Sequence, residues 1–151
     1  MTSTESGAKE VRYLPDVNVL LALSDEDHSS FAAAARWFAG IANAPFCLCA
    51  VTEAGFVRLA ANPQVGGRGL QDAVDLLEEI RSLPNCRSVP IDASWLELIR
   101  PITARMHGYR QVTYALLLGL AIHHNAILVT LDQKIRALAG EESNANLLTL
   151  L

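Results

Sequence analysis

Short apolar runs alternate with longer amphipathic segments along most of this chain. Apolar runs of strand length lie at 11–15, 46–51, 86–91, 126–130 and 146–150. Between them apolar residues recur at helical spacing, so helices are expected at 17–24, 31–41, 53–62, 70–83, 93–106, 113–124 and 132–140. Because strands alternate with helices, the pattern predicts an α/β fold: a mainly parallel central sheet of about five strands with helices on both faces.

Several residues mark where these elements should begin, end or bend. Pro15 has no amide hydrogen to donate, so it should end its strand. Thr52 and Thr113 carry hydroxyl groups suited to the N-cap position of a helix. Pro101 should kink the helix that contains it. The apolar stripe of the 70–83 helix should comprise Leu70, Val74, Leu77 and either Ile80 or Leu83.

Length and composition favour one soluble domain over residues 1–151, with residues 1–10 frayed. Of the 151 residues, 51% are hydrophobic and 19% are charged, which suffices for a sizeable core and is unlike a disordered chain. The longest apolar run, Ala115 to Ile122, is too short to span a bilayer. The polar start, MTSTESGAKE, lacks a hydrophobic signal segment. A cytoplasmic location without membrane contact is therefore expected.

Charge and cysteine usage narrow the function further. The net charge of −4 argues against a protein that coats nucleic acid with a basic surface, although a local basic patch could still meet RNA. Cys47, Cys49 and Cys86 form no CxxC pair and have no histidine at ligand spacing. We interpret them as small buried side chains in a reducing compartment. His123 and His124, at a helix C-terminus, are explained by the helix dipole.

Three acids follow three of the apolar strands. Asp16 ends the VRYLPD run, Glu53 follows CLCAVT, and Asp132 ends ILVTLD. Ligand sites in open parallel sheets lie beyond the carboxyl ends of the strands, so these carboxylates converge if the strands are neighbours. Each acid alone could merely favour a helix dipole. Together they predict a site for a hard divalent cation, because clustered carboxylates repel one another without one.

Four segments carry a resemblance to a known family. LPDVNVLLAL, CAVTEAGFVRLAANP, GYRQVTYALLLGLA and ILVTLDQKI resemble the signature blocks of PIN-domain toxins, the VapC ribonucleases of bacterial toxin–antitoxin pairs. The resemblance extends from Arg12 to Leu150 and implies a three-layer α/β/α sandwich. It implies an endoribonuclease that cleaves RNA phosphodiester bonds with water activated by Mg²⁺ or Mn²⁺. It also implies a VapB-type antitoxin as partner, and a homodimer.

The resemblance assigns roles to individual residues. It implies that Asp16, Glu53 and Asp132 are the catalytic and metal-binding acids. Beside them, three residues are candidates for orienting the acids, and one is a candidate for contacting RNA phosphate. The orienting candidates are Asn18, Thr52 and Thr130, and the RNA-binding candidate is Arg110. Thr52 could instead cap a helix, Thr130 could be an ordinary strand residue, and Arg110 could pair with a surface acid.

Tyr114 departs from the family's pattern. The family usually has a further aspartate after the VT dipeptide, and here the tyrosine stands in its place. A phenol is neutral at pH 7 and is a poor ligand for Mg²⁺. We therefore expect nuclease activity to be strongly reduced or absent. Alternatively, Tyr114 turns away and packs as a first-turn aromatic without a part in the site.

Two other functions stay open. The chain could be a catalytically silent module that binds only antitoxin or RNA, which Tyr114 favours. It could also be a small-molecule phosphohydrolase or a nucleotide binder on a doubly wound sheet. The glycine-rich QVGGRG segment matches neither GxGxxG nor a phosphate loop, which disfavours the phosphohydrolase or nucleotide binder. We interpret this segment as a connector.

Overall fold

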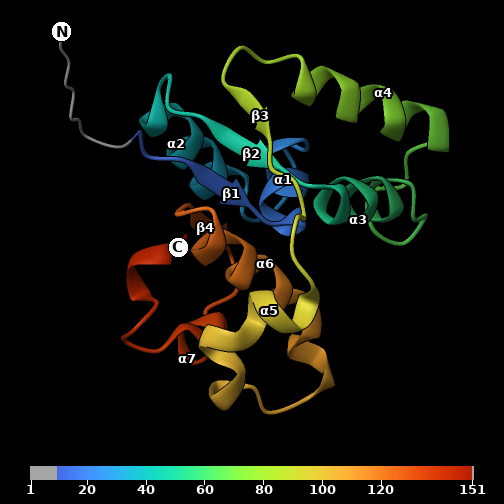
Figure 1. Ribbon diagram of the computed structural model, residues 1–151. Coiled ribbons are helices and arrows are strands. Elements are labelled where there is room, and N and C mark those ends of the chain that lie inside the picture. Colours follow the sequence, from blue (N-terminus) through green and yellow to red (C-terminus); the bar gives the residue numbers. More distant parts are fainter. Residues whose placement is uncertain (1–9, 151) are drawn as a thin grey trace, which may run out of the picture.

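The computed structural model describes residues 10–150, and a five-stranded parallel sheet forms its centre (Figure 1). The strands are β1 (Tyr13–Pro15), β2 (Phe46–Leu48), β3 (Cys86–Ser88), β4 (Ile127–Thr130) and β5 (Leu147–Thr149). Their order is β3-β2-β1-β4-β5, with every pairing parallel. The predicted parallel sheet is therefore confirmed. The expected fraying of residues 1–10 falls, apart from Glu10, outside the described residues.

Helices cover both faces of the sheet and complete the three-layer α/β/α sandwich. The α-helices are α1 (Val17–Leu23), α2 (Phe31–Ile41), α3 (Ala50–Ala60), α4 (Leu70–Arg81), α5 (Trp95–Ile99), α6 (Val112–His123) and α7 (Ile135–Ala139). Short 3-10 helices lie at Arg100–Arg105, Tyr109–Gln111 and Asn144–Asn146. Figure 1 shows α5, α6 and α7 grouped below β1 and β2 and α4 above them; α1, α3 and α4 share a core cluster with β2, on the other side from the cluster of α5, α6 and α7.

Side chains that alternate along the strands divide the core between the two faces. Leu14 and Leu128 pack among the residues of α5, α6 and α7. Phe46 and Leu48 pack with residues of α1, α3 and α4, and Val129 packs beside α2. Because successive strand residues point to opposite faces, a sheet covered on both sides needs apolar residues at nearly every position. This requirement explains the continuous apolar runs in the sequence.

Helix α3 begins earlier than predicted from Thr52 as its N-cap. Its N-cap is Cys49, so Thr52 lies inside the first turn and caps nothing. Thr52, Phe56 and Ala60 are all buried, four residues apart. Their burial on one face of the helix outweighs the N-cap preference of a threonine. The strand predicted at 46–51 ends at Leu48, because the chain turns into α3 at Ala50.

Other boundaries differ for similar reasons. A 3-10 turn leads into α6, whose N-cap is Gln111, so Thr113 is not the cap. Helix α5 ends at Ile99, and a 3-10 helix containing Pro101 follows, as expected of a proline that disrupts an α-helix. In α4, Leu70 at the N-terminus is 66% exposed, while Ala73 is the residue that is fully buried.

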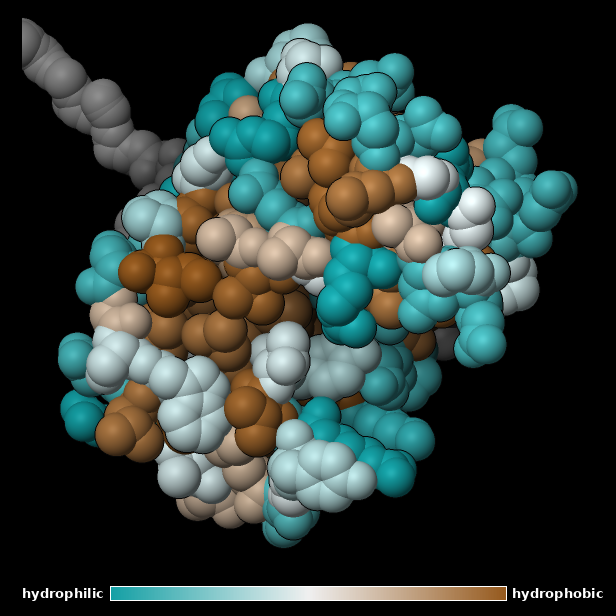
Figure 2. Space-filling view, turned by 90° about the vertical axis from the view of Figure 1, so that its right-hand side faces the viewer, coloured by the Kyte–Doolittle hydropathy of each residue, from teal (hydrophilic) through white to brown (hydrophobic). Residues whose placement is uncertain are grey.

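The surface carries hydrophobic side chains in patches. Figure 2 shows such patches near the middle of one face, bordered by polar residues. Along residues 10–150, no helix combines the length and apolar character needed to cross a membrane.

Candidate functional site

Two of the predicted acids meet at the carboxyl edge of the sheet. Strands β1 and β4 are neighbours; Asp16 follows β1 directly, and Asp132 follows β4 after one residue. The amide of Asp16 donates a hydrogen bond to the carbonyl of Val129, at 2.9 Å. This bond continues the β1–β4 pairing to the point where the acids lie. The adjacent strands thus bring these acids together, as expected from the sequence.

Asp16 is fixed in one orientation. It is the N-cap of α1, and its Oδ1 accepts the amide of Val19 at 3.0 Å. Its Oδ2 accepts the Thr130 hydroxyl at 2.6 Å, and only 2% of the residue is exposed. Both oxygens therefore have a donor from a neighbouring element, which holds the carboxylate rigidly at the junction of β1 and α1.

Thr130 also links Asp16 to Asp132. Its hydroxyl oxygen accepts the amide of Asp132 at 3.1 Å while it donates to Asp16. The Oδ1 of Asp132 in turn accepts the amide of Lys134 at 2.9 Å. Thr130 is fully buried, so its hydroxyl fixes the spacing of the two acidic residues as well as occupying a strand position.

The surroundings of Asp16 and Asp132 disfavour two ionised carboxylates without a nearby positive charge. Burial raises the pKa of Asp16, and the charge of Asp132 raises it further. Hydrogen bonds from Thr130 and from the backbone amides of Val19 and Asn18 lower it; each of them is smaller than the effect of burial but larger than that of the Asp132 charge. Within residues 10–150, neither Asp16 nor Asp132 forms a salt bridge. A positive charge placed between them would relieve both the desolvation and the repulsion.

The side chain of Tyr114 lies near both acids. It lines a cavity of about 510 Å³ together with Asp16 and Asn18. It also lines a cavity of about 310 Å³ together with Asp132 and Arg110. Burial, followed by the charges of Asp16 and Asp132, raises the pKa of Tyr114 to about 12, although a hydrogen bond with Asn18 lowers it. The phenol is therefore neutral at physiological pH. Its ring packs against the core and also faces both acids, which favours a part in the site over the alternative of a peripheral aromatic.

Glu53 is engaged outside the cavity at Asp16. It does not line the cavity at Asp16, which α3 lines through a different face. Its carboxylate forms a salt bridge with Arg81 of α4, and Arg81 also donates to the Ser88 hydroxyl at 2.8 Å. The face of α3 toward the cavity carries Val51, Ala54, Gly55, Arg58 and Leu59. Successive residues of an α-helix are rotated by about 100° around its axis. In a helix that begins at Ala50, position 53 therefore lies off the face that lines the cavity, and its side chain reaches Arg81 of α4 instead.

The remaining predicted residues divide between the site and the core. Asn18 lines the Asp16 cavity, and Arg110 lines the Asp132 cavity while its guanidinium lies 5.7 Å from the Tyr109 ring centre. Thr52 is fully buried instead, and its hydroxyl lies 2.9 Å from the Cys49 sulfur. The structure therefore places Asn18 and Arg110 beside the acids, whereas the Thr52 hydroxyl contacts the N-cap residue of its own helix.

Arg58 is a cavity residue that sequence reasoning missed. It lines the Asp16 cavity from α3, and Lys134 lines the Asp132 cavity. A signal for Arg58 exists in the sequence, because it lies at helical spacing from Val51, Ala54 and Gly55. Gly55 in turn allows α1 to approach, since a Cβ there would lie 2.9 Å from a Val17 methyl group.

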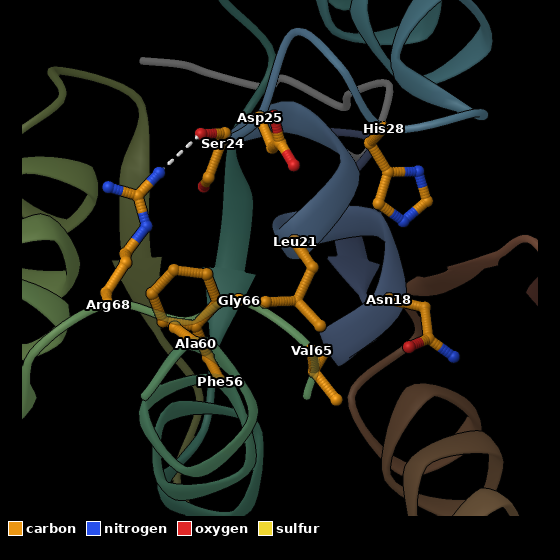
Figure 3. Close-up of a pocket in the computed structure, with 10 residues that line it drawn as sticks. All are labelled: Asn18, Leu21, Ser24, Asp25, His28, Phe56, Ala60, Val65, Gly66 and Arg68. Atoms are coloured by element: carbon orange, nitrogen blue, oxygen red, sulfur yellow. Dashed lines mark hydrogen bonds between the residues drawn. The ribbon is translucent and has the colours of Figure 1, made fainter. Parts of the chain in front are cut away.

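A further cavity of about 320 Å³ adjoins Asn18 on the other side (Figure 3). Leu21, Asp25 and His28 contribute to its wall, and Arg68 donates to the Ser24 carbonyl at 2.9 Å. The QVGGRG segment, expected to be a connector, therefore packs its arginine against the end of α1. Asn18 is the residue that this cavity shares with the one at Asp16.

Comparisons with known proteins agree with this architecture. The PIN domain model matches residues 13–141. Ribonuclease VapC38 of Mycobacterium tuberculosis is 37% identical over 142 residues, covering 91% of this chain and 99% of the relative. Ribonuclease VapC44 of the same species is 35% identical, covering 83% of this chain and 89% of the relative.

A solved structure shows the same fold. It is VapBC2 from Rickettsia felis bound to a DNA fragment from their promoter, with a TM-score of 0.66 and 13% identity. The likeness covers 93% of this chain and 100% of the other. With the family match spanning most of the chain and relatives above 30% identity, this chain belongs to the PIN-domain family, in its VapC branch.

Proposed function

We propose that this chain is a toxin-type endoribonuclease whose cation site, formed by Asp16 and Asp132, is impaired by Tyr114. The observation that carries the proposal is a pair of linked carboxylates at the strand ends, one of them buried, with no salt bridge among the described residues. The ribonuclease names of the relatives support the substrate class. The acids, the metal and the RNA substrate remain parts of this proposal.

The donor set fits a hard divalent cation such as Mg²⁺ or Mn²⁺. Carboxylate oxygens are the ligands such ions prefer, with water completing the coordination. Asp16 is held in place by Val19 and Thr130, so little ordering would accompany binding. When bound, the cation would lower the pKa of a water molecule and neutralise charge on the phosphate.

The chain's own residues would bind and orient the RNA. Arg58 and Arg110 line the cavities on the two sides of Tyr114 and carry forks that match phosphate oxygens. Asn18 can hold the Asp16 carboxylate through its backbone amide and the Tyr114 phenol through its side-chain amide. A local basic pair of this kind suits a protein whose net charge is −4.

Tyr114 would weaken this site in two ways. A neutral phenol replaces the negative charge of the family's usual aspartate, so the attraction for a cation falls. The ring also takes up space beside Asp16 in one cavity and beside Asp132 in the other. Reduced cleavage is therefore expected in this chain, with activity recoverable by a smaller and charged side chain.

Glu53 remains a proposed ligand only on the strength of the family resemblance. To join the aspartates, its carboxylate would have to leave Arg81 and reach around α3. We therefore propose Asp16 and Asp132 as the direct ligands of the cation and give Glu53 the smaller contribution. Thr52, proposed from the sequence to support the acids, would act only through the packing of α3.

Cleavage of single-stranded RNA in Mn²⁺ tests the proposal. The Tyr114→Asp variant should cut RNA at least about tenfold faster than the parent chain, because one restored charge-assisted ligand is worth over 1 kcal/mol. The Asp16→Asn/Tyr114→Asp double variant is the matched control and should lose that gain. Equal cleavage by all three proteins would indicate a contaminating nuclease and would contradict the proposal.

A silent binding module is the second candidate, and the position of Tyr114 inside the site favours it. In that case the parent chain would bind RNA or an antitoxin without cutting. The distinguishing result is saturable RNA binding that survives Asp16→Asn, combined with no cleavage in Mn²⁺ even after Tyr114→Asp.

The partners proposed for the chain follow from the family. The Rickettsia neighbour is a VapBC complex, which supports a VapB-type antitoxin as the partner here. An apolar groove of about 210 Å³ between α1, α2 and α4 offers hydrophobic surface suited to such a partner. A homodimer and a cytoplasmic location complete the proposal.

A further inference from the structure

We propose a second metal site, for a borderline-soft transition ion such as Zn²⁺, formed by Asp92, His123 and His124. One ligand atom from each residue lies within 4.8 Å of the other two. The histidines end α6, and Asp92 comes from the segment between β3 and α5. This cluster shares no residue with the cavities at Asp16 and Asp132.

The cluster lies at the far end of α6 from the acids. Tyr114 is in the first turn of α6 and His123 is its last residue. At 1.5 Å per residue, the helix separates the two positions by about 13 Å along its axis. Because α6 leads into β4, its C-terminus lies at the amino edge of the sheet, opposite the aspartates. The two sites can therefore bind ions independently.

The ligand spacing matches a tetrahedral ion. The Nε2 of His123 lies 3.1 Å from Asp92 Oδ1, and the Nε2 of His124 lies 3.5 Å from the same oxygen. With zinc–ligand bonds of about 2.0–2.1 Å, two ligands of a tetrahedral ion are about 3.3 Å apart. The two spacings to Asp92 lie on either side of this value, and all three ligand atoms lie within 4.8 Å of one another. Two imidazoles and a carboxylate would leave a fourth position for water.

Both histidines present Nε2 to the same carboxylate oxygen of Asp92. Their ring planes cross at 87° with centroids 4.9 Å apart, so the rings are not stacked face to face. Without a metal, hydrogen bonds account for the arrangement: His123 pairs with Asp92, and His124 Nε2 lies 2.9 Å from the Pro90 carbonyl. An ion would replace these hydrogen bonds with three coordinate bonds from ligands that need only small shifts.

Ligand chemistry separates this site from the acidic one. Imidazole nitrogen suits zinc, nickel and copper, whereas carboxylate oxygen alone suits magnesium and manganese. Zn²⁺ should therefore prefer the histidine cluster, and excess Mg²⁺ should not displace it. Binding would join the end of α6 to the segment that precedes α5, and so should raise the melting temperature.

Calorimetric titration of Zn²⁺ into the untagged chain, in excess Mg²⁺, tests the proposal. We expect one saturable Zn²⁺ per chain and a rise in melting temperature. His123→Gln should weaken binding at least about tenfold, because a three-ligand site loses a donor. His107→Gln is the matched control, an exposed histidine outside the cluster, and should bind like the parent.

Further variants identify any other source of binding. Asp92→Asn should weaken Zn²⁺ binding as His123→Gln does, whereas Asp16→Asn and Cys86→Ser should leave it unchanged. No saturable binding, or equal affinity in His123→Gln and the parent, would overturn the proposal. Loss of binding in Asp16→Asn or Cys86→Ser, but not in His123→Gln, would overturn it equally.

Discussion

Asp16 is the residue on which the local architecture and the proposed chemistry both depend. Its carboxylate caps α1 through Val19 and accepts the hydroxyl of Thr130 in the neighbouring strand. The same burial that fixes it raises its pKa. A side chain that stabilises a helix start thus carries an electrostatic cost, which a bound cation would offset.

The stability of the chain should therefore change with pH in a predictable direction. Because the pKa of Asp16 is raised on folding, its contribution is full below the unfolded value of about 3.9 and is lost as pH rises through the folded value. Asp16→Asn should be more stable than the parent at pH 7 in chelator, because asparagine carries no charge that burial would penalise. The difference should shrink below about pH 4.

Thermal melts of both proteins across this pH range provide the measurement. Glu78→Gln, on the exposed face of α4, is the control and should show no comparable gain. If Asp16→Asn is less stable than the parent by the same amount at every pH, its capping role outweighs its charge.

The salt bridge of Glu53 with Arg81 predicts a smaller role in metal binding than the family resemblance implies. Because its carboxylate pairs with Arg81, Glu53→Gln in a Tyr114→Asp background should reduce Mn²⁺ affinity much less than Asp132→Asn does. The half-exposed ion pair should cost less than about 1 kcal/mol of stability when broken. Calorimetry on the two variants decides the matter; an equal loss of affinity would mean that Glu53 leaves Arg81 to bind the ion.

Among the elements, α6 is the one that positions both sites, and it packs closely against α5. A Cβ at Gly119 would lie 2.3 Å from the Leu98 carbonyl oxygen, closer than any real contact. The glycine therefore permits backbone-to-backbone approach between the two helices. This packing holds Tyr114 at one end of α6 and His123 at the other.

Gly119→Ala should destabilise the fold by about 1–3 kcal/mol, because α5 and α6 must separate to admit the methyl group. Gly40→Ala is the matched control: it is also a helical glycine, but nothing lies within 4 Å of its added Cβ. That change should be neutral or stabilise by up to about 1 kcal/mol. Urea unfolding of both variants is the measurement, and equal stability would show that the helices can shift freely.

The sequence predicted well which segments form strands and which form helices. It predicted poorly where a helix begins and therefore which of its faces points to the core. Runs such as 126–130 identify buried strands because a sheet covered on both faces needs continuous apolar residues. The start of α3 depends instead on which face packs against the sheet, and that is a tertiary choice. The positions of Asp16 and Asp132 were predictable because they lie within two residues of a strand end, whereas the direction of the Glu53 side chain depends on where α3 begins.

At the scale of the whole molecule, the parallel sheet separates two kinds of ligand chemistry. Its carboxyl edge carries the aspartates, and its amino edge carries the histidine cluster at the end of α6. The cluster was not predicted from the sequence, because Asp92 lies 31 residues before His123 and only folding brings them together.

Assembly is a prediction at this scale. If the chain forms the homodimer that its family implies, light scattering should give twice the 16.3 kDa mass of the chain. The measurement should be repeated after Zn²⁺ is added, since neither proposed metal site requires a second copy. A monomer at micromolar concentration would contradict the dimer and leave both metal sites standing.

The most direct test of the central claim is a calorimetric titration of Mn²⁺ into the parent chain, Tyr114→Asp and Tyr114→Phe. If Asp16 and Asp132 form a cation site that Tyr114 weakens, Tyr114→Asp should bind at least about tenfold more tightly than the parent. Tyr114→Phe, which keeps the ring and adds no charge, should bind like the parent. Equal Mn²⁺ affinity in all three proteins, or none in any, would contradict the account.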